Sequence, residues 1–250
     1  MIFAEVDTIE FVLFGLELVE PNVFITDTLL GLLSIYFGIK LYRAGSADPF
    51  FKNWRYFFYA FGVGAIAGGA GHMLITYTGL AGKIPAWIMG IIAVHFIELA
   101  MLSAHQKESF TLYFRKISNI KLYVVLFSLS LILIFSNRVR TVEFSILLVI
   151  INTLVGVVMT TGVLGAAYRR SGLSDSFRHL VTGVIIMLPS SLVFILDINL
   201  HRWFDKNDLS HLILGIGIYF FYKGVRELDL TESITSSRVL RTEAVKVKNP

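Results

Sequence analysis

The sequence predicts an all-α membrane protein, a bundle of seven transmembrane helices with its N-terminus outside and its C-terminus in the cytoplasm. Three observations favour this fold class: an apolar composition, seven long apolar blocks, and an uneven distribution of Lys and Arg. Of the 250 residues, 55% are hydrophobic and 16% are charged, whereas a soluble globular domain is about 25% charged. A chain with so few charged residues cannot cover itself in water, which indicates a bilayer location.

Apolar blocks of about 18 residues or more are typical of membrane-spanning helices. The sequence contains seven apolar blocks, which run near 26–43, 56–78, 84–105, 121–136, 143–168, 178–198 and 209–226. Because the connections between these blocks are short, we expect one transmembrane bundle over residues 26–228 and no second domain.

Polar segments are expected at the two ends of the chain. Residues 1–25 form an acidic segment whose first twenty residues carry five Asp and Glu and no Lys or Arg. This composition lacks the basic start of a cleavable signal peptide and predicts an interfacial helix that lies on the membrane. Residues 229–250 show no apolar periodicity, which predicts a disordered, basic cytoplasmic tail.

The distribution of Lys and Arg predicts the orientation. With seven spans, the N-terminus shares one side of the membrane with the second, fourth and sixth loops, and that side carries five of the 22 Lys and Arg. These five are Lys83, Arg138, Arg140, Arg202 and Lys206. The other seventeen fall on the side of the C-terminus, so the positive-inside rule places that side in the cytoplasm.

Ionisable side chains near or within the apolar blocks are expensive to place in a bilayer and therefore mark candidate sites. In the predicted orientation, four separate segments deliver polar residues of this kind to the outer face. They are Glu20, Asn22 and Asp27 around the start of the first block, His72 in the second, Asp197 and His201 at the end of the sixth, and Asn207, Asp208 and His211 at the start of the seventh. This convergence favours a functional site over a scatter of unrelated residues.

Imidazole and carboxylate groups are ligands of zinc-type metals, and a catalytic zinc needs three protein ligands and an open position. His72 and His211 are candidate ligands because each lies in an apolar run. The third ligand would come from Asp197, His201, Asn207 or Asp208. The alternative is that these residues are interfacial groups that hydrogen-bond loop backbone or lipid headgroups.

A second polar pair lies deeper in the predicted bundle. His95 and Glu98 are three residues apart, so they share a helix face, and Glu98 lies roughly 21 Å into its span at 1.5 Å per residue. Two interpretations stay open: a proton-handling or hydrogen-bonding group that lines a cavity, or a buried Glu–His pair that holds two helices together. The five glycines from Gly62 to Gly71 favour close packing of the second span against its neighbours.

Three segments resemble the CREST superfamily of seven-span membrane proteins, which includes alkaline ceramidases and the progestin and adipoQ receptors. EPNVFITDTLLG (20–31) is similar to a segment in which a Glu and an Asn bind calcium before the first helix. GVGAIAGGAGH (62–72) is similar to a run of small residues that ends in a histidine, and NDLSHLILGIGIY (207–219) to a last-span motif of two histidines. The resemblance implies a zinc ion held by His72 and His211 and a calcium ion held by Glu20 and Asn22.

The chain departs from the resembling pattern at four positions, where it carries Asn207 for a histidine, Gly68 for a serine, Lys83 for an aspartate and Gly31 for a glutamate. Two functions therefore stay open. The first is metal-dependent hydrolysis of a lipid amide or ester, in which the metal activates water and Asp197 or Asp208 is the third ligand or the general base. The second is a non-enzymatic lipid-binding or receptor-like membrane protein with a decayed metal site.

Other classes of function are excluded by simple features. The chain has no Cys, so it forms no disulfide and no thiolate metal site. Its basic residues flank the apolar blocks as membrane anchors, which argues against nucleic-acid binding. The only last-span lysine, Lys223, lies near the cytoplasmic end and not at mid-span, where a retinal protein needs it. We expect membrane lipids as partners, including a lipid substrate, and a multi-pass location in a plasma, inner or endomembrane.

Overall fold

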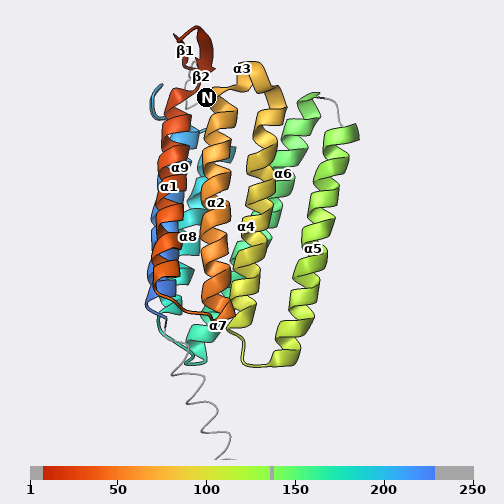
Figure 1. The fold of residues 1–250 in the computed structure, drawn as a ribbon, viewed down its shortest axis with the longest axis vertical. Coiled ribbons are helices and arrows are strands. Elements are labelled where there is room, and N and C mark those ends of the chain that lie inside the picture. Colours follow the sequence, from red (N-terminus) through yellow and green to blue (C-terminus); the bar gives the residue numbers. More distant parts are fainter. Residues whose placement is uncertain (1–7, 136–137, 229–250) are drawn as a thin grey trace, which may run out of the picture.

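Long helices lie side by side in a single bundle (Figure 1). The computed structural model describes residues 8–135 and 138–228. Its long helices are α1 (Pro21–Arg43), α2 (Pro49–Met73), α4 (Ile84–Ser103), α5 (Glu108–Phe135), α6 (Arg138–Val157), α8 (Phe177–Ile195) and α9 (Lys206–Arg226). α6 continues through the π-helical η2 (Val158–Leu164) into α7 (Gly165–Arg170), and the short α3 (Ile75–Thr78) and η1 (Gly79–Lys83) connect α2 to α4. Each predicted apolar block overlaps one of the long helices. The block near 143–168 overlaps α6, η2 and α7, which follow one another without a break.

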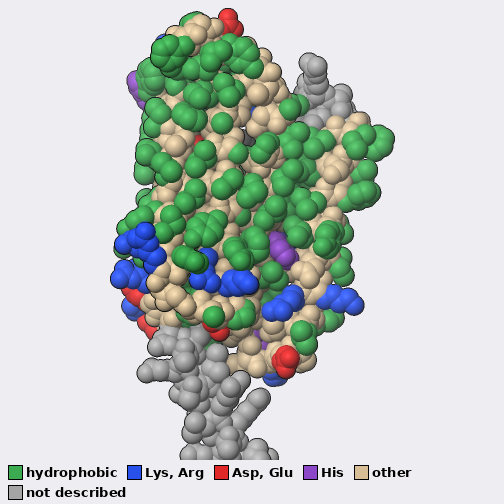
Figure 2. Space-filling model, in the orientation of Figure 1, with side chains coloured by type: hydrophobic (Ala, Val, Ile, Leu, Met, Phe, Trp, Pro, Cys, Tyr) green, Lys and Arg blue, Asp and Glu red, His purple; other side chains and the backbone are tan. Residues whose placement is uncertain are grey.

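The helices carry the apolar surface that a bilayer requires. Within the described residues, four helical segments are long and apolar enough to cross a membrane: Pro21–Arg43, Ile75–Ser103, Glu108–Phe135 and Phe144–Arg170. Large apolar side chains such as Leu29, Phe127 and Ile185 are exposed along the flanks of the bundle, and Figure 2 shows hydrophobic side chains over most of one face. An apolar surface of this extent marks contact with a membrane. The structure therefore agrees with the prediction of a helical membrane protein.

Small residues bring the first two helices together. A Cβ at Gly31 of α1 would lie 2.6 Å from the carbonyl oxygen of Gly62 in α2, and a Cβ at Gly62 would lie 2.6 Å from that of Gly31. Any side chain at either position would therefore force the helices apart. α2 also packs on α4, and α9 packs on both α8 and α1, whereas α5 lies outside against α4 and α6. The predicted role of the glycine run in helix packing is confirmed.

The two ends of the bundle differ in charge. Figure 2 shows Lys and Arg gathered on one face toward the end away from the N-terminal strands. That end also holds the buried aromatic core, in which Trp54 packs edge-on against Phe57 and Phe221. We call the opposite end, where the N-terminal strands and α3 lie, the hairpin end (Figure 1).

The predicted interfacial helix near the N-terminus is wrong for the described residues. β1 (Glu10–Leu13) and β2 (Leu16–Val19) form an antiparallel hairpin in which Glu10 pairs with Val19. Phe14 and Gly15 form the two-residue turn with positive φ values of 51° and 79°, the turn geometry that matches the twist of paired strands. The hairpin contacts α3 through a hydrogen bond from the Glu17 amide to the Tyr77 hydroxyl. The predicted disordered tail, 229–250, lies outside the described residues.

Candidate functional site

Polar side chains from four segments meet at the hairpin end of the bundle. We call this group the hairpin-end cluster; its members are Glu20, Asn22, Thr26 and Asp27 at the start of α1, His72 near the end of α2, Lys83 in η1, and Asp205, Asp208 and His211 at the start of α9. Two features of α1 position its members: Glu20 precedes the helix in a left-handed conformation (φ 52°), and Pro21 then starts the helix. Three of the four predicted segments thus meet in this cluster, whereas Asp197 and His201 from the sixth block are not members of it and Lys83 takes part instead.

Asp208 is the most enclosed carboxylate of the cluster, with 1% of its surface exposed. It forms a capping box with Asp205 at the start of α9. Its Oδ2 accepts a hydrogen bond of 2.7 Å from the Asn22 amide, and its Oδ1 accepts one of 2.7 Å from the Thr26 hydroxyl. Asp208 therefore joins α9 to α1 as well as capping its own helix. Burial raises the pKa of Asp205 above its ordinary value, and the neighbouring Asp208 charge adds to this effect.

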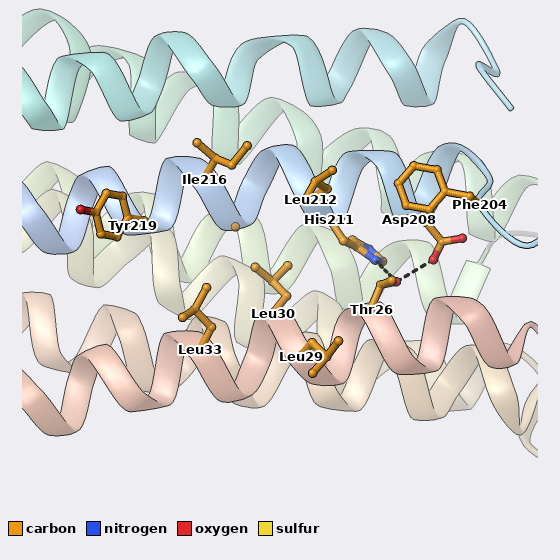
Figure 3. Close-up of a pocket in the computed structure, with 11 residues that line it drawn as sticks. Thr26, Leu29, Leu30, Leu33, Phe204, Asp208, His211, Leu212, Ile216 and Tyr219 are labelled. Carbon is orange, nitrogen blue, oxygen red and sulfur yellow. Dashed lines mark hydrogen bonds between the residues drawn. The ribbon is translucent and has the colours of Figure 1, made fainter. Parts of the chain in front are cut away.

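His211 lies one turn further along α9 and uses both ring nitrogens. Its Nδ1 is 3.0 Å from the Thr26 hydroxyl, and its Nε2 is 3.2 Å from Oδ1 of Asp27. Figure 3 shows the Thr26 side chain between the His211 ring and the Asp208 carboxylate. α2 leaves room for Asp27 because it carries glycines there: a Cβ at Gly69 would lie 2.9 Å from the Asp27 Cβ, and one at Gly68 would lie 3.4 Å from Oδ2.

His72 pairs with a different carboxylate. Its Nδ1 is 2.5 Å from Oε2 of Glu20, and its Nε2 is 3.5 Å from the Lys83 ammonium. Burial by itself would raise the pKa of Glu20, but the hydrogen bond from His72 and the charges of Lys83 and Lys206 outweigh it and hold this pKa below its ordinary value. The two histidines thus share one end of the bundle, and each is engaged by its own carboxylate.

These partners do not form a zinc site. Among the described residues, no three His, Cys, Asp or Glu side chains are arranged to hold a metal ion. The Nε2 of His72, the atom a metal would take, faces the cationic Lys83. Of the other predicted ligands, Asp197 is exposed and bonded to the Lys206 ammonium at 2.6 Å, and His201 is exposed and accepts a bond from the Trp203 amide. The donor set does not fit the zinc that the resemblance implies.

Calcium fits no better. Glu20, Asn22, Asp197, Asp205 and Asn207 line a polar cavity of about 160 Å³, and the same cavity is lined by Arg202 and Lys206. The Oδ1 of Asn22 is buried and has no hydrogen-bond partner among the described residues. Two cationic side chains in so small a cavity oppose a divalent cation, so we derive no role for calcium.

An apolar groove adjoins the cluster. It has a volume of about 440 Å³ and runs between α1 and α9 from Thr26, Asp208 and His211 at one end toward Tyr219 at the other. Its walls are apolar: Leu29, Leu30 and Leu33 from α1, and Phe204, Leu212, Gly215 and Ile216 from the α9 side (Figure 3). The groove therefore combines a long hydrocarbon surface with a cluster of polar groups at one end and the single hydroxyl of Tyr219 at the other.

Glu98 belongs to a second polar group, which we call the Glu98 cluster: His95 and Glu98 in α4, Ser118 and Lys121 in α5, and Asn152 in α6. The Lys121 ammonium pairs with Oε1 of Glu98 and lies 2.9 Å from the Asn152 side-chain oxygen. Ser118 donates a hydrogen bond of 2.5 Å to Glu98 and lies 3.0 Å from His95 Nδ1. His95 thus reaches Glu98 through Ser118, and the partner of Glu98 is a lysine.

Sequence reasoning missed several members of these groups. Lys121 is one of the seventeen Lys and Arg that the sequence assigns to the cytoplasmic side, because it stands at the start of the apolar block near 121–136, but it lies in the middle of a helix that starts at Glu108. Asn152 and Thr26 are polar positions inside apolar runs, and that signal is visible in the sequence. Lys83 and Asp205 lie in connections, where nothing in the sequence separates them from ordinary surface residues.

The sequence matches a family model over residues 22–230, and the family is described as a family of unknown function, DUF6962. The match covers the helical bundle and begins inside the hairpin-end cluster, at Asn22. No curated protein and no solved structure matches the chain.

Proposed function

The chain belongs to the DUF6962 family, and we propose that it is a seven-span membrane protein that binds an amphiphilic lipid in the groove between α1 and α9. The observation that carries the proposal is the form of this groove, with apolar walls along two helices and the hydrogen-bonded Thr26, Asp208 and His211 at one end. A lipid has the matching form, since its hydrocarbon chain is apolar throughout and its hydrogen-bonding groups are confined to one end.

The proposed orientation places the hairpin end outside. The described Lys and Arg are concentrated at the other end, as in the cytoplasmic flanks of multi-pass proteins. The polar end of the groove then lies near the outer interface, where lipid headgroups are found, and the apolar walls lie at the depth of the acyl chains. From Thr26 to Leu33 the wall on α1 is roughly 10 Å long at 1.5 Å per residue, so the groove holds part of one acyl chain.

The headgroup end is suited to a neutral hydrogen-bonding group. Asp208 already accepts bonds from Asn22 and Thr26, and His211 is placed between Thr26 and Asp27. Thr26 and His211 line the groove and carry atoms that both donate and accept hydrogen bonds. A hydroxyl, ester or amide of the lipid would exchange bonds with these two side chains without bringing a new charge beside Asp208.

Binding without metal-dependent hydrolysis is the function that the site supports. Hydrolysis by a zinc-bound water needs three protein ligands, and the described donors do not provide them. The resemblance to CREST proteins remains a prediction, and it agrees with a lipid as the ligand. We derive no catalytic step from the hairpin-end cluster.

The proposal is tested with a substitution that places a larger side chain in the groove. The Gly215 Cβ position has only the Leu30 Cδ1 nearby, at 3.7 Å, so Gly215→Leu places a side chain in the groove with little change in the helix. Binding of a monoacylglycerol labelled with nitrobenzoxadiazole, which has a neutral headgroup of hydroxyls and an ester, is measured by fluorescence in detergent-solubilised protein. We expect the variant to bind this probe at least about tenfold more weakly, a difference of about 1.4 kcal/mol.

The matched control is a variant in which the same substitution places a side chain in a different cavity. Gly90 lines an internal apolar cavity of about 280 Å³ between α2, α4, α6, α8 and α9, and its Cβ position is 3.8 Å from the nearest atom. Gly90→Leu should leave probe binding unchanged. If Gly90→Leu weakened binding and Gly215→Leu did not, the lipid would occupy the internal cavity and the proposal would be wrong.

A further inference from the structure

We propose that the Lys83 ammonium supplies the positive charge of the hairpin-end cluster in place of a metal ion, so that the cluster is complete without metal. The inference concerns the charge of the cluster and does not depend on lipid binding in the groove.

The backbone places Lys83 against His72. η1 folds back onto the end of α2 through a close contact between Gly71 and Gly82, where a Cβ on Gly71 would collide with the Gly82 carbonyl and one on Gly82 would collide with Thr78. Because neither residue has a side chain, the connection returns within eleven residues and puts the Lys83 Nζ 3.5 Å from Nε2 of His72.

Hydrogen-bond chemistry then fixes the roles of the His72 nitrogens. An ammonium group has donors only, so Nε2 faces Lys83 as the acceptor and Nδ1 carries the proton. That proton is donated to Oε2 of Glu20, 2.5 Å away. The result is a continuous series of hydrogen bonds from the Lys83 ammonium through a neutral imidazole to the Glu20 carboxylate. The lone pair on Nε2 of His72, which a metal would need, is therefore already directed at a cation.

The lysine also offsets the negative charge of Glu20. Against the effect of burial, the hydrogen bond from His72 and the charges of Lys83 and Lys206 hold the pKa of Glu20 below its ordinary value. A partly buried carboxylate needs a nearby cation or a full set of hydrogen bonds, and Lys83 is the cation that lies against the Glu20–His72 pair. Asp27, by contrast, pairs with His211 at 3.2 Å.

The consequence is that removal of the lysine charge should destabilise the Glu20–His72 pair. In Lys83→Met the side chain keeps its length and loses its charge, which leaves Nε2 of His72 without its donor and Glu20 without the lysine charge. We expect the melting temperature of this variant to fall by at least about 3 °C. Lys83→Arg keeps the charge and should stay close to the original chain.

The test measures metal content and thermal unfolding on the full chain in detergent. Inductively coupled plasma mass spectrometry of the original chain should show no stoichiometric divalent metal, and its melting temperature should be the same with ZnCl₂ and with EDTA. Lys40→Met, which removes an exposed cation at the opposite end of the bundle, should be as stable as the original chain.

Three results would overturn the inference: stoichiometric metal in the original chain that is lost in His72→Ala, a Lys83→Met variant as stable as the original, or a Lys83→Arg variant destabilised as much as Lys83→Met. If Lys83→Met fails to fold, Lys83→Gln and the metal content of the original chain decide the question. Probe binding in the groove is scored separately, so a failure here leaves the proposed lipid site to its own test.

Discussion

The hairpin-end cluster and the Glu98 cluster are both buried polar groups, yet they are built differently. The first draws on helix ends and a connection, contains carboxylates, imidazoles and a lysine from four segments, and adjoins both a polar cavity and an apolar groove. The second lies within three helices and centres on one ion pair, Glu98 with Lys121. Both clusters contain a buried atom without a partner, Oδ1 of Asn22 in the first and Nδ2 of Asn152 in the second. What separates the proposed ligand site from the Glu98 cluster is therefore the open volume beside it, and not burial or charge.

The largest expected effect is in the Glu98 cluster. Lys121→Met removes the partner of a carboxylate that is only 5% exposed, and an uncompensated charge in such a place destabilises a protein by about 3–5 kcal/mol. Thermal or denaturant unfolding in detergent measures the loss, and probe binding in the groove should be unchanged for the fraction that folds.

The double variant Glu98→Leu with Lys121→Met serves as the control, because replacing both charges with apolar groups is often neutral or stabilising. If the double variant regains stability, the Glu98 cluster is a packing element and the contrast with the hairpin end is sharpened. If the single variant Lys121→Met were as stable as the original chain, the ion pair would not be a structural element at all.

A smaller effect is expected from the residue that makes room for this ion pair. A Cβ at Gly156 would collide with the Val94 side chain and lie 2.7 Å from Oε1 of Glu98, so Gly156→Ala should displace both side chains and destabilise the bundle by about 1–3 kcal/mol. Gly162→Ala, six residues further along, is the matched control, since its nearest neighbour lies at 3.5 Å. Equal melting temperatures for the two variants would show that Val94 and Glu98 have freedom to move.

At the hairpin end, the expected effect is on binding more than on stability. Thr26→Val removes the hydroxyl that lies between His211 and Asp208 and keeps the shape of the side chain. We expect the affinity for the labelled monoacylglycerol to fall by roughly 3- to 10-fold, the loss of about one hydrogen bond. Thr153→Val makes the same change in the lining of the internal cavity and should leave affinity unchanged. Unaltered binding by Thr26→Val would remove this residue from the site.

The smallest effect is a pH dependence at the Glu20–His72 pair. Because the folded-state pKa of Glu20 is lowered from about 4.5, its contribution to stability is present above that value and is lost as pH falls through the folded-state pKa. Unfolding followed from pH 6 down to pH 3 should therefore show a loss in the original chain that is smaller in Glu20→Gln. Glu17→Gln, in the hairpin, should retain the full pH dependence, and a Glu20→Gln profile that matched it would argue against the pair.

Much of the bundle could be predicted from the sequence. The seven apolar blocks fall on the long helices, and the glycines around Gly62 lie at a close helix contact, because hydropathy and the absence of a side chain are local properties of the chain. The N-terminal hairpin was missed because acidic and apolar residues alternate there in a pattern that also suits an interfacial helix, and the turn at Phe14 and Gly15 was the signal against it.

The sequence does not predict which polar side chains pair with one another. It indicates that His72, His211 and several carboxylates come to one end of the bundle, and that Glu98 needs a partner. Only the tertiary structure decided that His72 pairs with Glu20 and faces Lys83, that His211 pairs with Asp27, and that Lys121 reaches Glu98. The physical reason is that hydropathy acts along the chain, whereas a hydrogen bond or ion pair depends on distances of about 3 Å between segments that can be more than a hundred residues apart.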